Sequence, residues 1–350
     1  MSRPMTPTAV RPTRRTLLAM LGLGTGAGVL AACGGGGDGG GNGGGASTVI
    51  APCYPIAFLA QRIGGDHLEV VNLATPGADA HGLELSVRQV QQLRDAALVV
   101  QIAGFQAAID DAISTHGDEN VLEVAEAMTM LPSVGHEGHD HDDHEDEHLD
   151  EHEGHEHASD AGGDHEDHEG EEVHEGHEHG PTDPHFWQDP LRMADLGDAL
   201  ATRLGNIAPD QAETFTSNAQ TLRTELEELD AELSEKYGAV QGERPFVTSH
   251  AAYAYLADRY DLHQIGITGV DPEVEPSPQR LLELERVIKD EGVTTIFFET
   301  TASPKVAQTL ADNVGVKSEE LDNLATQLSE EADYPRVMRE NAEKLVASWS

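Results

Sequence analysis

Histidine is the residue type in this sequence that most clearly can do chemistry, and its distribution is very uneven. Residues 136–180 contain 13 of the 19 histidines and 20 acidic side chains, but no lysine or arginine. Imidazole nitrogen beside carboxylate oxygen is a ligand set that suits Zn²⁺, and also Ni²⁺, Cu²⁺ or Co²⁺. Spacings such as His136-x-x-His139-x-His141 offer two or three imidazoles to one ion without a fixed backbone. The segment is therefore expected to collect several ions loosely, so selectivity must come from elsewhere in the chain.

The same segment is too polar to fold by itself. It has so few apolar residues that it cannot bury enough surface to offset the entropy of ordering the chain. We expect a disordered, metal-collecting loop; the alternative is a solvated acidic linker with incidental histidines. Protons compete for imidazoles near the usual histidine pKa of about 6.5, so metal capture by this loop should weaken in acid.

The overall charge excludes several classes of partner. The 350-residue chain has 21 lysines and arginines against 64 aspartates and glutamates, which gives a formal net charge of −43. Such a charge argues against binding to nucleic acid and against adhesion to anionic lipid through protein charge. It suits a cation-handling surface or an extracytoplasmic protein. The length predicts about two domains, each able to bury a core.

Residues 1–32 are typical of a bacterial export signal. Their weakly apolar run is too short and too rich in glycine for a membrane-spanning helix, which needs about 20 apolar residues. The pair Arg14-Arg15 favours the twin-arginine route, with general secretory export as the alternative. A Leu-Ala-Ala tripeptide precedes Cys33 and matches the cleavage site of lipoproteins, in which this cysteine carries a diacylglycerol. Cys33 is thus the predicted membrane anchor, and residues 33–46 form a glycine-rich tether.

Cys53 is the second of the two cysteines. Since Cys33 is used by the lipid, no disulfide is expected in the mature chain. Cys53 follows an apolar strand, and we interpret it as a small buried residue rather than a metal ligand.

Strand and helix signals alternate in residues 47–135, the predicted amino-terminal lobe. Strands are expected at residues 48–50, 68–74 and 97–103, and helices at residues 55–63, 86–95 and 105–115. This order favours a parallel sheet with helices on its faces. Residues 181–209 are assigned to the end of the same lobe.

A single long helix is predicted in residues 210–240. Apolar residues recur there at gaps of three or four over about 28 residues, which corresponds to roughly 42 Å of helix. The stripe consists of Ala212, Phe215, Ala219, Leu222, Leu226, Leu229, Leu233 and Tyr237. A free coiled coil is the alternative, but the flanking α/β units favour a helix that packs across both lobes.

Residues 241–350 return to the α/β pattern and form the predicted carboxy-terminal lobe. Strands are expected at residues 246–248, 263–268 and 293–298, with helices at residues 251–259 and near the end of the chain. Two further helices are expected to begin at Ser277-Pro278 and Ser303-Pro304, because serine caps a helix and proline suits its first position. The predicted fold class is therefore α/β: two Rossmann-like lobes with parallel sheets, joined by one long rigid helix.

Six histidines lie outside the acidic segment, and three of them occupy junctions between elements. His81 lies in a turn-rich loop, His185 directly follows the acidic segment, and His250 ends a strand. Ligands of open α/β sheets bind beyond the carboxyl ends of strands, where His250 lies and where Asp322 would lie after a short strand. The other three, His67, His116 and His263, are interpreted as ordinary surface or capping residues.

Residues 47–350 resemble the zinc-binding, lipid-anchored solute-binding proteins of ABC-type metal importers, the cluster A-I type. Each matching motif is weak alone, but their order and spacing together are specific. The motifs are Ile63-Gly64-Gly65-Asp66, Gly77-Ala78-Asp79-Ala80-His81, Asp183-Pro184-His185-Phe186-Trp187, Ser249-His250-Ala251-Ala252-Tyr253, Glu275-Pro276-Ser277-Pro278, Phe298-Glu299 and Leu321-Asp322. The histidine-rich insertion also stands in the family's usual place.

The resemblance implies one metal bound in the cleft between two lobes. His81 and His185 would be ligands from the first lobe and His250 from the second, with Asp322 as the candidate for the fourth position. Three imidazoles with a carboxylate or a water favour Zn²⁺. Members that resemble manganese-specific proteins carry a carboxylate at the position of His250, so histidine there supports zinc. Glu299, at the end of a strand, is a candidate acceptor for a ligand imidazole.

Three departures from the family pattern concern the ligand segments. Ala80 replaces a frequent proline, Gly82 replaces a frequent aspartate, and Asn323 follows Asp322 where proline is frequent. The fourth ligand is accordingly the least well defined by sequence.

The resemblance implies a monomeric binding protein that captures Zn²⁺ outside the cytoplasmic membrane and delivers it to an ABC transporter permease. One alternative is a surface metal buffer or adhesin that is not coupled to transport, and another is an importer component for Mn, Ni or Co. A metallohydrolase is disfavoured, because outside the acidic segment the sequence has no His-Glu-x-x-His motif.

Overall fold

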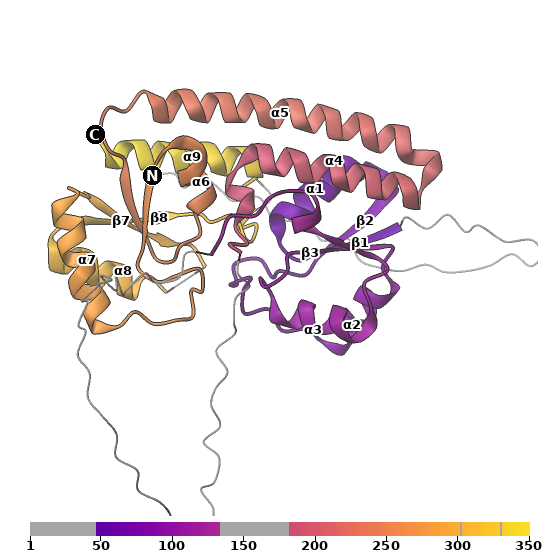
Figure 1. The fold of residues 1–350 in the computed structure, drawn as a ribbon, viewed down its shortest axis with the longest axis horizontal. Coiled ribbons are helices and arrows are strands. Elements are labelled where there is room, and N and C mark those ends of the chain that lie inside the picture. The colour runs from indigo at the N-terminus through magenta and orange to yellow at the C-terminus, as the bar shows by residue number, and fades with distance from the viewer. Residues whose placement is uncertain (1–46, 134–181, 302, 330) are drawn as a thin grey trace, which may run out of the picture. The chain divides into compact units, whose positions relative to one another are not determined.

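The computed structural model describes residues 47–133, 182–301, 303–329 and 331–350 (Figure 1). All of these described residues belong to one compact unit. The predicted export signal, Cys33, the tether and the histidine-rich segment all lie outside the described residues. Among the helices that the structure describes, none is long and apolar enough to cross a membrane.

Two parallel sheets form the two lobes, as the sequence predicted, and each sheet has four strands. The amino-terminal sheet has the order β2-β1-β3-β4 and the carboxy-terminal sheet the order β6-β5-β7-β8. The strands are β1 (Ser47–Ala51), β2 (Leu68–Asn72), β3 (Leu98–Gln101), β4 (Val121–Glu123), β5 (Pro245–Thr248), β6 (His263–Gly266), β7 (Thr295–Glu299) and β8 (Lys317–Leu321). The two lobes therefore repeat one strand order.

Alternating side chains divide each sheet between two hydrophobic cores. In β1, Val49 faces the largest core and Ile50 faces a separate core of the first lobe. In β5, Phe246 faces the same largest core and Val247 faces a separate core of the second lobe. This alternation is the period of two that a strand imposes. One hydrophobic core is thus shared by both lobes.

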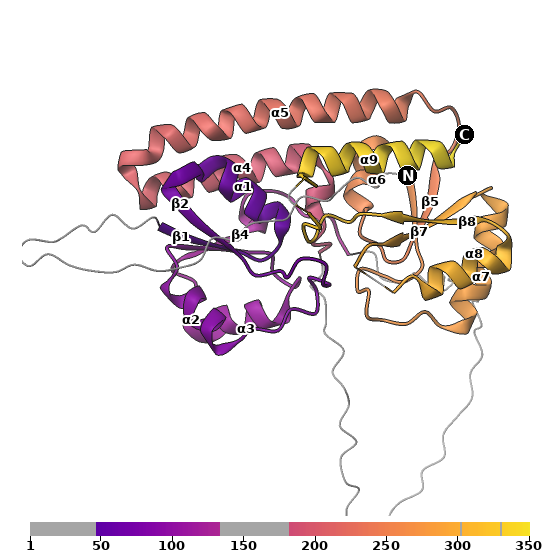
Figure 2. The same ribbon diagram turned by 180° about the vertical axis from the view of Figure 1, so that it is seen from behind.

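Helices cover both faces of each sheet (Figures 1 and 2). Those on the outer faces are α2 (Val87–Asp95), α3 (Ala107–His116), α7 (Pro278–Asp290) and α8 (Lys305–Val314). Those on the shared core are α1 (Tyr54–Gly64), α4 (Pro190–Ile207), α6 (Ala254–Tyr260) and α9 (Tyr334–Ser348). As predicted, Ser277 caps α7 by accepting a hydrogen bond from the Arg280 amide.

The long helix α5 (Ala212–Gly238) has 27 residues and spans about 40 Å. It packs against α1 and α4 of the first lobe and against α6 and α9 of the second (Figure 2). The predicted stripe is confirmed from Phe215 to Tyr237, whose seven members are all buried, while Ala212 is half-buried. This helix therefore contacts both lobes within the compact unit.

Three local features differ from the sequence-based expectation. Helix α4 was not predicted, although Asp189 caps it and Pro190 lies in its first turn; Gly197 and Gly205 weaken its intrinsic helix preference. Helix α6 begins after residue 251, since the Ala251 amide donates to the Gly269 carbonyl instead. The prediction that Ser303 caps α8 is wrong: Pro304 occupies the N-cap and its carbonyl accepts the first helical hydrogen bond.

Candidate metal centre

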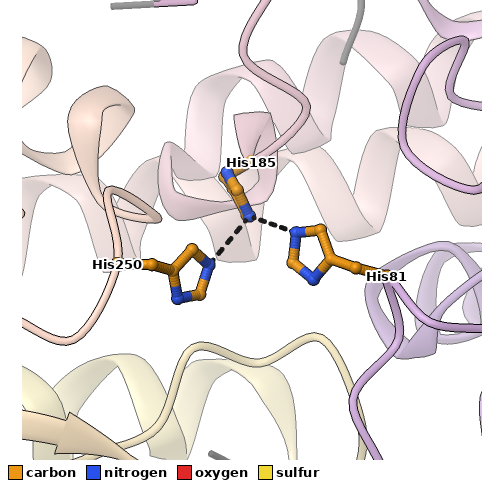
Figure 3. A group of neighbouring side chains, drawn as sticks. All are labelled: His81, His185 and His250. Atoms are coloured by element: carbon orange, nitrogen blue, oxygen red, sulfur yellow. Dashed lines mark hydrogen bonds between the residues drawn. The ribbon is translucent and has the colours of Figure 1, made fainter. Parts of the chain in front are cut away.

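Three imidazoles from distant parts of the chain meet between the lobes (Figure 3). The Nε2 atom of His185 lies 3.2 Å from that of His81 and 3.4 Å from that of His250. One ring nitrogen from each of the three lies within 4.8 Å of the others. The three residues are 9%, 0% and 1% exposed for His81, His185 and His250. The structure therefore brings together the three histidines that the motifs singled out, and it meets the geometric condition for sharing one ion.

Two of the imidazoles are oriented by an aspartate two residues earlier in the chain. Asp79 Oδ1 accepts hydrogen bonds from the His81 amide at 2.9 Å and from His81 Nδ1 at 2.8 Å. Asp183 Oδ1 accepts from the His185 amide and from His185 Nδ1, both at 2.8 Å. The aspartate thus closes a local turn and fixes the ring at the same time.

The third imidazole is oriented across its sheet. His250 follows β5 and Glu299 ends the neighbouring strand β7, so both lie at the carboxyl edge of the second sheet. Glu299 Oε2 accepts from His250 Nδ1 at 2.5 Å, and Glu299 Oε1 accepts from the His250 amide at 3.3 Å. The proposed role of Glu299 as an acceptor for a ligand ring thus has the required geometry.

This pattern of hydrogen bonds leaves the three Nε2 atoms facing one another. Each Nδ1 atom donates to a carboxylate, so each Nε2 atom presents a lone pair unless that ring is also protonated there. A single proton can join only two of the three nitrogens. A cation among them would interact with all three lone pairs at once, which is the arrangement that a metal ion needs.

Burial and the carboxylates determine the charge of the rings. Burial lowers the pKa of His81 to about 4 and also lowers the pKa of His185, so both rings are neutral at pH 7. Burial also acts against the charged form of His250, but the adjacent Glu299 outweighs it and raises the pKa of His250. Hydrogen bonds from His81 outweigh burial at Asp79 and lower its pKa to about 2. Two of the three imidazoles are thus already in the neutral form in which a histidine can bind a metal ion.

Asp322, the candidate for the fourth position, is not among these mutually close ligand atoms. It follows β8, its Oδ1 accepts from the Leu324 amide at 2.8 Å, and Asn341 binds its backbone. Its carboxylate borders a cavity of 270 Å³ that Glu320 and Lys344 also line. Burial raises its pKa.

The three histidines that we interpreted as ordinary surface or capping residues are not part of the metal centre. His67, His116 and His263 are exposed, and His263 pairs with Glu291 at 2.9 Å. Cys53 is buried and is not in a disulfide, and burial raises the pKa of its thiol to about 12. Its interpretation as a small buried residue is confirmed.

An acidic cavity of 610 Å³ opens beside the centre, and His81 is the one of the three histidines that lines it. The cavity lies between the lobes, because residues of the first lobe and the segment around Glu273 of the second both form its walls. Its acidic lining residues are Glu84, Asp110, Asp111, Asp271 and Glu273. A cleft with one sign of charge raises the local concentration of the opposite charge, here of cations.

Asp79 and Asp183 are the functional residues to which sequence reasoning gave no role. The sequence does contain a signal for this role, because Asp-x-His occurs at both positions and an aspartate commonly binds the backbone amide two residues later.

Two α/β lobes with parallel sheets share one core, and three imidazoles converge between them; this combination is that of a solute-binding protein for a metal ion. The model of the ZnuA family, described as "Zinc-uptake complex component A periplasmic", matches residues 49–348. The chain therefore belongs to this family, whose members are binding components of zinc uptake and not enzymes. The resemblance drawn from the sequence is confirmed.

Individual relatives agree with the family. Zinc-binding protein AdcA of Streptococcus pyogenes serotype M3 is 33% identical over 304 residues, which cover 85% of this chain and 55% of that protein. Zinc-binding lipoprotein AdcA of Streptococcus pneumoniae is 29% identical over 302 residues, with 85% and 54% covered. A Zn(II)-bound variant of AdcAII from Streptococcus pneumoniae superposes with a TM-score of 0.69 at 27% identity, covering 88% of this chain and 100% of that one. The chain spans about half the length of the curated relatives it matches.

Proposed function

We propose that this protein captures Zn²⁺ outside the cytoplasmic membrane and delivers it to the permease of an ABC transporter. The observation that carries the proposal is the convergence of three ring nitrogens, from His81, His185 and His250, within 4.8 Å of one another. Membership in a zinc-uptake family supports zinc as the cargo and import as its use. The acidic cavity beside His81 provides a route along which a cation is attracted.

Zn²⁺ suits three imidazoles because it prefers nitrogen ligands in a tetrahedral arrangement. One position then remains for a carboxylate or a water. Asp322 stays our candidate for that position on the motif match, and a carboxylate movement would be needed to bring it to the three rings.

Release is expected to use local loop movements rather than a wide opening of the lobes. Helix α5 and the shared core join the lobes along their length, so a hinge motion would separate packed apolar surface. His81, by contrast, lies on the loop between β2 and α2, which has no helix or strand of its own. Asp79 binds His81 within this loop, and Gln106 Nε2 donates to the Ala80 carbonyl at 2.7 Å. A shift of this loop would remove one ligand without separating the two lobes.

The protein is expected to act as a monomer attached to the outer face of the cytoplasmic membrane through a lipid on Cys33. The name of the pneumococcal relative, a zinc-binding lipoprotein, supports this location. We assign the histidine-rich residues 136–180 to loose collection of metal near the selective centre.

A zinc titration of the purified chain tests the proposed site. Zinc is supplied below one equivalent against a chelator, so that the tightest site fills first. The variant His81→Ala/His185→Ala/His250→Ala should lose this tight site. The matched control His67→Ala/His116→Ala/His263→Ala removes three exposed imidazoles and should keep it. Tight binding retained in the first variant would defeat the assignment.

Deletion of residues 136–180 separates the selective centre from the collecting segment. The deletion is feasible because Pro132 and Thr182, which flank the segment, already pair in a β-bridge. The shortened protein should bind about one zinc per chain, and native metal analysis of it should find zinc rather than nickel, cobalt or manganese.

Import is distinguished from surface buffering or adhesion by growth. A strain that lacks the gene should grow poorly under zinc starvation and recover when zinc is added. Normal zinc uptake in that strain would favour the buffer or adhesin, which membership in a zinc-uptake family does not favour.

A further inference from the structure

The two chain segments that flank residues 134–181 meet directly beside the metal centre. The Asp183 amide donates to the Leu131 carbonyl at 2.8 Å, and Pro132 and Thr182 form an antiparallel bridge. We call residues 130–133 and 182–183 the neck. The neck belongs to the first lobe and ends two residues before His185.

One phenol from the opposite lobe binds both strands of the neck. Tyr255, on α6, accepts a hydrogen bond from the Leu131 amide at 2.8 Å. The same hydroxyl donates to the Asp183 carbonyl, also at 2.8 Å. Tyr255 is completely buried, so water does not compete for these two hydrogen bonds. The hydroxyl therefore joins the second lobe to both sides of the neck.

The first lobe in turn holds the ring of Tyr255. The guanidinium of Arg192, on α4, lies 4.8 Å from the centre of this ring. Arg192 also donates to the carbonyl of Thr129, one residue before the neck. A stacked cation and two hydrogen bonds leave the phenol a single orientation.

Asp183 connects this contact to the metal centre. Its backbone binds Leu131 and Tyr255, while its Oδ1 accepts from the amide and the ring of His185. Its Oδ2 atom has no hydrogen-bond partner among the described residues, and the side chain is fully buried. The position of Asp183, and with it the direction of the His185 ring, thus depends on its backbone contacts.

We propose that Tyr255 is a positioning residue for zinc binding, which acts through Asp183 to aim the His185 imidazole at the ion. The inference rests on the proposed function, because it presumes that His185 is a ligand. The second lobe then contributes to the metal centre in two ways: His250 supplies an imidazole, and Tyr255 fixes the direction of the His185 ring of the first lobe. The neck, from which the histidine-rich segment departs, is thereby tied to the geometry of the selective site.

The test is the variant Tyr255→Phe, which removes one hydroxyl and keeps the ring under Arg192. Zinc affinity should fall by about tenfold, the lower end of the loss seen when an outer-shell partner of a metal ligand is removed. The rate of zinc dissociation should rise by a similar factor. With Co²⁺ as a spectroscopic probe, the visible absorption bands of the bound ion should shift, because the His185 ring is aimed differently.

Tyr253→Phe is the matched control. Tyr253 lies two residues away and is equally buried, but its hydroxyl has no hydrogen-bond partner among the described residues. It should keep both the zinc affinity and the Co²⁺ spectrum of the wild type. If Tyr255→Phe lowers only the melting temperature of the metal-free protein, and zinc affinity and spectrum stay unchanged, Tyr255 is merely structural and the proposal is wrong.

A double-variant comparison tests the path through Asp183. If Tyr255 acts through this residue, adding Tyr255→Phe to Asp183→Asn should cause little further loss of affinity. Fully additive losses would contradict the path. Should Tyr255→Phe fail to fold, Arg192→Gln weakens the hold on the same ring and should also reduce zinc affinity. Failure of the wild type to bind zinc would instead overturn the proposed function, so the two failures are distinguishable.

Discussion

Replacing Glu299 with glutamine tests how much the carboxylate behind His250 contributes to the metal centre. Glu299 is 2% exposed and makes two contacts to one residue, 2.5 Å to His250 Nδ1 and 3.3 Å to the His250 amide. Glutamine keeps the shape and an acceptor oxygen but removes the charge. Loss of such a partner costs about 10- to 100-fold in metal affinity, or roughly 1.4–2.8 kcal/mol. The burial of Glu299 places the expected loss in the upper half of that range.

The assay is a competition titration against a chelator at pH 7.5, with less than one equivalent of zinc. Glu291→Gln is the matched control, because it removes a carboxylate from the ring of the exposed His263 in the same lobe. The control should bind zinc as the wild type does. An affinity of Glu299→Gln within twofold of the wild type would refute the reasoning.

Proton release provides a second, independent measurement of the same change. Glu299 raises the pKa of His250 above 6.5, so at pH 6.5 more than half of the metal-free wild type carries a proton on this ring that zinc must displace. Without the carboxylate the pKa of His250 falls. Calorimetry in two buffers at pH 6.5 should therefore detect fewer protons released by Glu299→Gln, even though it binds zinc more weakly. Unchanged proton release would show that Glu299 does not control the charge of this ring.

Three further predictions follow from the structure. Zinc affinity of the wild type should fall by about tenfold per pH unit once the pH drops below the raised pKa of His250, because one proton must then leave for each ion bound. A zinc affinity that stays constant between pH 7 and pH 5 would contradict this. The metal-free protein should lose stability as the pH falls from about 6.5. In the folded state the pKa of His81 is lowered to about 4 and that of His185 is also lowered, so only the unfolded chain takes up protons at these two rings, while the raised pKa of His250 acts in the opposite sense. Chemical denaturation at pH 7.5 and 5.5 measures the difference in the free energy of unfolding. Asp322→Asn, which keeps the oxygen that accepts from Leu324, should weaken zinc binding by at least the roughly tenfold that loss of an outer-shell partner costs, and an unchanged affinity would assign the fourth position to water.

Much of the fold could be predicted because its signals are local. The stripe on α5 has a regular period of three or four, and all of its members except Ala212 are buried. Ser277-Pro278 likewise predicted the start of α7, since capping depends on two adjacent residues. Helix α4 was missed although its capping Asp189 and first-turn Pro190 are local signals of the same kind, and its packing against α1 and α5 could not be read from local sequence.

The three histidines were found by motif and position, but their mutual distances were not in the sequence. The loop after β2, the segment after residue 182 and the end of β5 are far apart in the sequence, and they meet only because one hydrophobic core joins the two lobes. The role of Tyr255 was beyond sequence reasoning for the same reason, since its partners Leu131 and Asp183 are more than 70 positions away. Asp322 shows the converse: its motif predicted a ligand, while its side chain lies outside the group of close ligand atoms.

The shared hydrophobic core has a thermodynamic consequence. Because α5 and the inner helices bury apolar side chains from both halves in one continuous layer, neither half retains a complete interior when the other melts. Heating should thus produce a single cooperative transition rather than two. Zinc, held at the junction, then raises the melting temperature of the entire polypeptide through mass action, by an amount set by the free zinc concentration relative to its dissociation constant.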